Sequence, residues 1–242
     1  MLNIKLTVEY DGSDFSGWQV QPDQRTVQGE IEKALRTLTH RKIRIIGAGR
    51  TDAGVHALGQ AVNFKCQDNL PLSAFEKGLD GLLPEDIHII AAEEAVKSFN
   101  ARRDAVSRVY RYVLSRKPRA VGRQYAWYPG MKFLLEPMEY ASKFLLGEHD
   151  FTSFCKSDGE HENFVSRVLK IKWSVREEEI HFEITAVRFF HKMIRIIVGT
   201  LLEVGRGKIS PENFREILAA RDRTQAGPTV PPQGLFLVKV NY

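Results

Sequence analysis

Residues 191–205, HKMIRIIVGTLLEVG, are apolar on nearly every side when drawn as a helix. A helix of this kind is stable only when other elements surround it, so it belongs in the middle of a packed molecule. The chain has 242 residues, enough for one large domain or two small ones with a substantial core. The segment falls well short of the roughly 20 apolar residues that a membrane helix needs, and it carries Arg195. We therefore expect a buried helix of a globular protein.

Alternation of apolar and polar residues, the pattern of half-buried strands, recurs along the rest of the chain. In the first half it predicts strands at 3–10, 42–50, 56–66 and 87–95, with helices at 26–38 and 72–82. In the second half it predicts strands at 107–115, 234–242 and two within 167–190, with helices at 136–147, 191–205 and from Ser210–Pro211. Strands and helices in this order predict an α+β protein with two α+β halves, 1–104 and 105–242.

Bulk composition narrows the class of protein further. A hydrophobic fraction of 43% with 27% charged residues is typical of globular chains and excludes a disordered one. Cys66 and Cys155 have no CxxC spacing, so neither a disulfide framework nor a structural zinc is indicated. The first residues alternate like a strand and lack the apolar block of a signal peptide. We expect a cytoplasmic protein.

Positive charge is concentrated between Arg102 and Arg123, where eight lysines and arginines accompany a single acid, Asp104. Tyr110 and Tyr112 lie among them. One interpretation is the solvated face of a strand and its following turn. The other is a surface that contacts the phosphates of a polyanion. Charge alone leaves both open.

The glycine-rich segment IGAGRTDAGVHALGQ, residues 46–60, combines Arg50, Asp52 and His56. It lacks the GK[ST] of a phosphate-binding Walker loop, and Asp52 stands where a dinucleotide fingerprint requires glycine. A backbone site for a phosphate stays open. Asp52 and His56 stand four residues apart, which is weak evidence for a metal site.

A second polar segment, GEHDFTSFCKSDGEH at 147–161, contains residue types that can bind metals. They are His149, Asp150, Cys155, Asp158 and His161. Their irregular spacing favours a polar loop over a metal centre.

Arg195 on the apolar helix needs a compensating partner, because a lone buried cation costs several kcal/mol. It could form a structural ion pair with an acid of the second half, or extend its charge to solvent. Alternatively it could pair with Asp52 in a cleft between the halves. That pairing would keep the carboxylate ionised as a nucleophile or base, and Arg50 beside it could hold a phosphate.

Six motifs in order resemble those of the tRNA pseudouridine synthase A (TruA) family. They are YDGSDFSGWQVQ with TVQGEIEKAL, GRTDAGVHA, FNARRDAVSRVYRYVL, GEHDFTSF, FFHKMIRIIVG and AGPTVPPQGLFLVKVNY. The resemblance extends along nearly the whole chain. One departure is Lys192, at a position where the family commonly has histidine.

The resemblance implies a pseudouridine-synthase-like α+β fold, in which two similar halves with largely antiparallel sheets meet at a central active-site cleft. It implies an enzyme that converts uridines 38, 39 and 40 of the tRNA anticodon stem-loop to pseudouridine, as a homodimer without cofactor or metal. Asp52 matches the catalytic carboxylate, and Arg195 matches its partner. Tyr110 matches the tyrosine that stacks on the target base, and Arg50 the arginine that holds the flipped nucleotide. The alternatives are a non-catalytic RNA-binding protein of the same fold and a metabolic enzyme whose glycine loop binds a phosphorylated small molecule.

Overall fold

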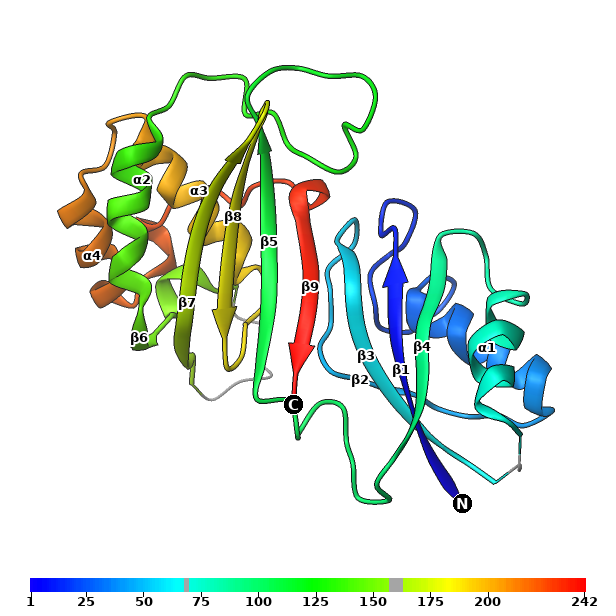
Figure 1. Ribbon diagram of the computed structural model, residues 1–242. Coiled ribbons are helices and arrows are strands. Elements are labelled where there is room, and N and C mark those ends of the chain that lie inside the picture. The colour runs from blue at the N-terminus through cyan, green and yellow to red at the C-terminus, as the bar shows by residue number, and fades with distance from the viewer. Residues whose placement is uncertain (68–69, 157–162) are drawn as a thin grey trace. The chain divides into compact units, whose positions relative to one another are not determined.

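The computed structural model describes residues 1–67, 70–156 and 163–242 (Figure 1). The chain divides into two compact units. Unit 1 comprises Met1–Val106 and Phe236–Tyr242, and unit 2 comprises Ser107–Leu235. The C-terminal strand, predicted as part of the second half, belongs almost entirely to unit 1 in the structure.

The sheet of unit 1 is built around β1 (Leu2–Tyr10). It pairs antiparallel with β3 (His56–Cys66) on one side and with β4 (Ile87–Ala95) on the other. Beyond β3 come the short β2 (Ile46–Gly47), antiparallel, and β9 (Leu235–Asn241), parallel to the start of β3. The pattern predicts a longer strand at 42–50. It is shorter because the N–H of Ile45 donates to Glu32 Oε1 of a helix (3.1 Å) instead of joining a strand.

One helix of unit 1, α1 (Val27–Thr39), begins as its sequence predicts. Thr26 caps it by accepting a hydrogen bond from the N–H of Gly29, and the apolar residues at helical spacing are buried. The predicted helix at 72–82 contains a π-helical turn, Ala74–Gly78. There Phe75 packs edge-to-face on Phe64 of β3, with ring centroids 5.6 Å apart.

The sheet of unit 2 is antiparallel, in the order β5 (Ser107–Ser115), β8 (Glu179–Ala186), β7 (Val165–Arg176) and β6 (Gly147–Asp150). The predicted hairpin of β7 and β8 is present, and Glu177 adopts a left-handed conformation in its turn (φ 49°). The irregular polar pattern of residues 147–161 predicts a loop where β6 lies. Four residues of that segment instead pair with the edge of β7.

The helices of unit 2 lie together on one side of its sheet (Figure 1). They are α2 (Leu135–Ser142), α3 (Met193–Gly205) and α4 (Pro211–Ala220). α3 is the predicted apolar helix, and nearly all its residues are buried. Unit 2 also contains short 3-10 turns at Lys143–Leu145, Thr152–Phe154, Arg223–Gln225 and Pro232–Gly234. Within the described parts of the chain, every helix is too short or too polar to cross a membrane.

Candidate active site

The glycine-rich loop lies in unit 1, between β2 and β3. Arg50 is exposed on it, and its Nη1 donates to Gln19 Oε1 (3.1 Å). Asp52 is half-buried, in a turn that the N–H of Val55 closes by donating to the Asp52 carbonyl (3.2 Å). A carboxylate and a guanidinium are thus presented by one short, tightly turned segment.

The segment that follows β1 holds this loop from the side. The N–H of Trp18 donates to the carbonyl of Thr51 (3.1 Å), and the Thr51 hydroxyl lies 2.8 Å from the buried hydroxyl of Tyr10. Burial raises the pKa of Tyr10 well above its ordinary value, against the opposing effect of the Thr51 hydrogen bond. Tyr10 therefore stays a neutral hydrogen-bonding partner of Thr51, the residue that precedes Asp52.

Two glycines allow the backbones of these segments to touch. A Cβ at Gly12 would lie 2.0 Å from the carbonyl oxygen of Val55. A Cβ at Gly17, which has a φ of +97°, would lie 2.8 Å from the carbonyl oxygen of Thr51. No side chain fits at either distance, so the residues on both sides of Asp52 are held by direct backbone contact. Gly49 differs, since open space surrounds the position of its Cβ.

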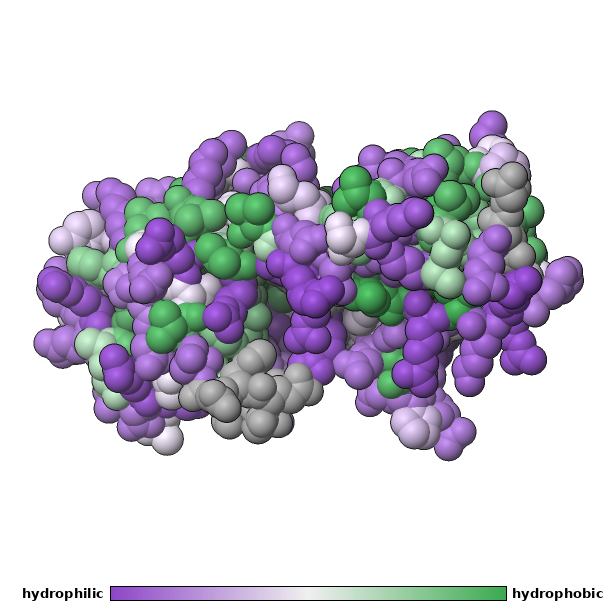
Figure 2. Space-filling view, turned by 90° about the horizontal axis from the view of Figure 1, so that it is seen from below, coloured by the Kyte–Doolittle hydropathy of each residue, from purple (hydrophilic) through white to green (hydrophobic). Residues whose placement is uncertain are grey.

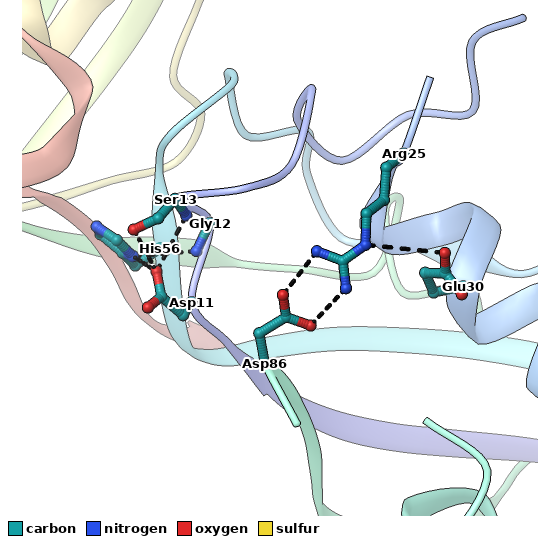
Figure 3. A network of polar contacts seen from close by, with 7 residues as sticks. All are labelled: Asp11, Gly12, Ser13, Arg25, Glu30, His56 and Asp86. Atoms are coloured by element: carbon teal, nitrogen blue, oxygen red, sulfur yellow. Dashed lines mark hydrogen bonds and ion pairs between the residues drawn. The ribbon is translucent and has the colours of Figure 1, made fainter. Parts of the chain in front are cut away.

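Side chains complete the support of the loop. The buried Gln60 donates from Nε2 to the carbonyl of Gly49 (2.9 Å). His56, also buried, stacks on Phe236 of β9 with ring centroids 4.7 Å apart. Its Nδ1 accepts the N–H of Gly12 (3.0 Å) and lies 3.0 Å from Asp11 Oδ1 (Figure 3). His56, which sequence spacing offers only as a weak metal ligand, thus joins the two loops.

A second contact in Figure 3 anchors the far end of the same segment. Arg25 donates to both carboxylate oxygens of Asp86 (2.7 and 2.8 Å), and its guanidinium lies over the ring of Phe15 at 4.1 Å. The two residues are far apart in the sequence, and no motif connects them. Sequence reasoning missed this pair, because only the pairing of β1 with β4 brings Asp86 beside the loop.

Tyr110 and Arg195, the other predicted site residues, lie in unit 2. Tyr110 is a buried residue of β5, opposite Ile184 of β8, and its ring packs edge-to-face on Phe189 at 5.0 Å. Arg195 is half-buried on α3. A contact between the Asp52 carboxylate and the Arg195 guanidinium would join the two units. That pairing stays a prediction.

The guanidinium of Arg195 has a fixed neighbour within its own unit. Its Nε donates to the carbonyl of Val230 (2.8 Å), and the N–H of Val230 donates back to the Arg195 carbonyl (3.2 Å). A Cβ at Gly199 would lie 1.8 Å from the carbonyl oxygen of Pro228, so this segment runs directly against α3. The Tyr112 hydroxyl donates to the carbonyl of Pro231 (2.8 Å). Burial raises the pKa of Tyr112, and the positive charge of Arg195 opposes that rise.

Lys192, the departure from the family pattern, stands immediately before α3. It has a left-handed backbone (φ 61°), and its side chain does not cap the helix. Histidine is enriched in this conformation among residues other than glycine. The backbone thus accommodates lysine here at some cost in conformational energy.

Three of the eight cations of the basic stretch lie beside acidic residues of the β7–β8 hairpin. Arg111 lies 3.3 Å from Glu183, and Arg119 lies 2.7 Å from Glu179. Lys117 lies 3.5 Å from Glu178. These pairs neutralise part of the positive charge of residues 102–123. The surface that this stretch forms is therefore less positive than a count of its lysines and arginines suggests.

The predicted polar loop at 147–161 is only partly within the described residues. Asp158 and His161 lie outside them. Asp150 Oδ1 accepts from the N–H and hydroxyl of Thr152 (3.0 and 2.6 Å), and His149 Nε2 lies 2.9 Å from the carbonyl oxygen of Leu146. Cys155, like Cys66, is a buried thiol. In the described ranges, no three histidine, cysteine or acidic residues are grouped so that they could hold a metal ion.

Comparison with known proteins places this geometry in context. A family model described as tRNA pseudouridine synthase matches residues 6–117 and 141–242. The tRNA pseudouridine synthase A of Caldicellulosiruptor bescii is 44% identical over 244 residues, covering 100% of both chains. That of Bacillus subtilis is 42% identical over 245 residues, covering 100% of this chain and 99% of its own. A solved archaeal box H/ACA sRNP Nop10–Cbf5 complex aligns over 83% of this chain and 44% of the other, with a TM-score of 0.38 and 10% identity, too low to support an argument.

Proposed function

The chain belongs to the tRNA pseudouridine synthase family and is an isomerase that converts uridine in tRNA to pseudouridine. We propose that it acts on the anticodon stem-loop, at positions 38, 39 and 40. We further propose that Asp52 is its catalytic carboxylate. The observation that carries the proposal is the support of the loop. Backbone contacts of Gly12 and Gly17 on either side of Asp52 fix that residue without covering it. Such preorganisation is what a catalytic group needs.

The reaction breaks the N1–C1′ glycosidic bond of uridine, turns the uracil and joins C1′ to C5. The hydrogen on C5 leaves as a proton and N1, freed from C1′, takes up a proton, so substrate and product have the same composition. The Asp52 carboxylate can start this reaction in three ways. It can attack the base, attack C1′ of the sugar, or take the C2′ proton.

The other site residues have complementary roles in this proposal. Arg195 pairs with the Asp52 carboxylate and keeps it ionised. Tyr110 stacks on the extruded uracil and accepts the C5 proton. Arg50, exposed on the same loop as Asp52, holds the phosphate of the flipped nucleotide, because extruding a base costs a few kcal/mol that such contacts must offset. The resemblance of the motifs further supports a cytoplasmic enzyme that works as a homodimer.

A position-specific assay tests the proposed substrate. Transcripts of tRNA labelled with tritium at C5 of uridine should release tritium with the wild-type protein. Release should cease when the uridines at positions 38, 39 and 40 are all replaced by cytidine. A control transcript with uridines replaced in the acceptor stem should still release label. Full release from the transcript without uridines 38–40 would contradict the anticodon stem-loop as the target.

Arg195→Met should lower activity far more than stability. Methionine suits an apolar helix, so the melting temperature should fall by only a few degrees, through loss of the hydrogen bond to Val230. Asp52 would lose its cation, and kcat should fall by roughly a hundredfold. Thermal melting and tritium release measured on the same preparations check this, with Arg188→Met as an exposed control. A large drop in melting temperature with normal activity of the folded fraction would make Arg195 purely structural.

A further inference from the structure

A second basic site lies in unit 1, toward the C-terminal end of β3, and Ile46 at the start of the glycine-rich segment lines one side of it. It is a pocket of about 650 Å³ formed by the segment before β2, the end of β3 and the segment that follows β4. We call it the basic pocket. Its cations are Lys42, Arg44, Lys65, Lys97 and Arg103. The described residues that line it include no carboxylate. The basic pocket therefore suits an anion and repels a metal ion.

The charge of the basic pocket differs from that of the basic stretch in unit 2. There, acidic side chains of the hairpin pair with Arg111, Lys117 and Arg119. In the basic pocket, all five cations are exposed to solvent. Figure 2, a view from below, shows strongly hydrophilic side chains with apolar ones exposed between them on the unit 1 part of the surface, at the right. One acid lies at its edge, since the Asp104 carboxylate accepts the N–H of Asn100 (2.9 Å). Five exposed cations against this single acid leave an excess of positive charge that attracts an anionic ligand.

Buried hydrogen bonds hold the wall of the pocket in place. Asn3 of β1 donates from Nδ2 to the carbonyls of Val96 and Phe99 (2.9 and 3.0 Å). Asn63 of β3 donates to Asn3 Oδ1 (2.9 Å) and accepts the N–H of Ala101 (2.8 Å). Both asparagines are about 1% exposed. These contacts attach the segment 96–101, which carries Lys97, to the sheet, and the Lys65 ammonium donates to the Lys97 carbonyl. The fold of unit 1 thus fixes the backbone segments that carry these cations.

The end of the basic pocket that carries Lys65 is distant from the proposed position of the target uridine at Asp52. Lys65 lies near the end of β3, whereas the catalytic loop enters the same strand at His56. At roughly 3.3 Å per residue, the two ends are on the order of 30 Å apart. A tRNA anticodon stem adds five stacked base pairs at roughly 3 Å each, which is too short to span that distance.

We propose that the basic pocket binds phosphates of the tRNA backbone beyond the anticodon stem-loop, so that full-length tRNA is held at two places. This inference rests on the proposed function, since it takes the target uridine to be at Asp52. The volume is within the range of sites that enclose a nucleotide-sized group. Contacts to phosphate fix the position of the RNA without reading its sequence, which suits an enzyme that acts on many tRNAs.

The test uses the double variant Arg44→Gln/Lys97→Gln and a control with the same change in net charge, Lys33→Gln/Lys77→Gln, whose two lysines are exposed elsewhere on unit 1. The pocket variant should raise the Kd for full-length tRNA roughly tenfold and flatten the slope of log K against log salt by about 1.5 to 2. Its Kd for the isolated stem-loop, and its kcat at saturating tRNA, should equal those of the wild type. The control should match the wild type in all three measurements.

Each contrary result has a distinct meaning. An unchanged Kd for tRNA, or an equal loss with the stem-loop or with the control variant, would overturn the second contact. Those outcomes leave the proposed function intact, because it depends on release from uridines 38–40 by the wild-type protein. Conversely, release that does not depend on those uridines would reject the proposed target, whatever the variants bind.

Discussion

Asp52→Asn is expected to lower pseudouridine formation by at least about a thousandfold while folding and tRNA binding stay unchanged. Asparagine has nearly the shape of aspartate, so the turn closed by Val55 and the contacts of Thr51 should persist. It carries no negative charge, and each of the three routes open to this residue requires the anion. The loss should therefore appear in kcat and not in the Kd for tRNA.

Tritium release from tRNA labelled at C5 of uridine measures this loss, because every route expels that hydrogen. Melting temperature and tRNA affinity should be measured on the same preparation. Asp23→Asn is a matched control, since Asp23 is an exposed residue in a left-handed turn that asparagine tolerates. Turnover within tenfold of the wild type by Asp52→Asn would remove Asp52 as the catalytic group.

Gly12→Ala is expected to impair both stability and activity, although the change is a single methyl group outside the glycine-rich loop. The new Cβ would lie 2.0 Å from the Val55 carbonyl oxygen, which is backbone, so one of the two segments must move. Overpacking of this kind costs about 1–3 kcal/mol in the free energy of unfolding. The displaced segment includes Val55, whose N–H closes the Asp52 turn, so kcat should also fall by at least about tenfold.

Chemical denaturation and tritium release per folded molecule check the two parts of this prediction. Gly81→Ala is the matched control, because its new Cβ would meet its nearest neighbour, the carbonyl oxygen of Lys77, at 3.8 Å, an ordinary contact. That variant should be close to the wild type in both measurements. Wild-type kcat in Gly12→Ala would show that the position of the glycine-rich loop does not depend on its contact with the segment after β1.

Local sequence signals predicted the elements whose cause is local. The N-caps Thr26 and Ser210 accept the hydrogen bonds that their positions before apolar helical patterns indicate. The alternation on either side of Glu177–Glu179 produces the β7–β8 hairpin. Where the prediction failed, a contact with a distant part of the chain decided the outcome. Glu32 takes the N–H of Ile45 and shortens β2, and β7 gives β6 a partner.

The candidate site divides in the same way. The sequence alone indicates which residue types form the site. It shows a glycine-rich loop with Arg50 and Asp52, and a cation inside an apolar helix. The contacts that hold these residues in place cannot be predicted from the sequence. The contacts of Gly12 with Val55, of Arg25 with Asp86 and of Gln60 with Gly49 join residues that no spacing relates.

The sequence by itself therefore determined the class of fold, the family and the chemical groups available for the reaction, because propensity, periodicity and motif order are properties of neighbouring residues. Only the tertiary structure decided which lysines and arginines are paired with acidic side chains and which are not. Acids of the β7–β8 hairpin neutralise part of the basic stretch, while the basic pocket gathers cations from three separate segments with no acid in its described lining. Charge acts through distance in space, and distance in space is set by the packing of strands that lie far apart in the chain.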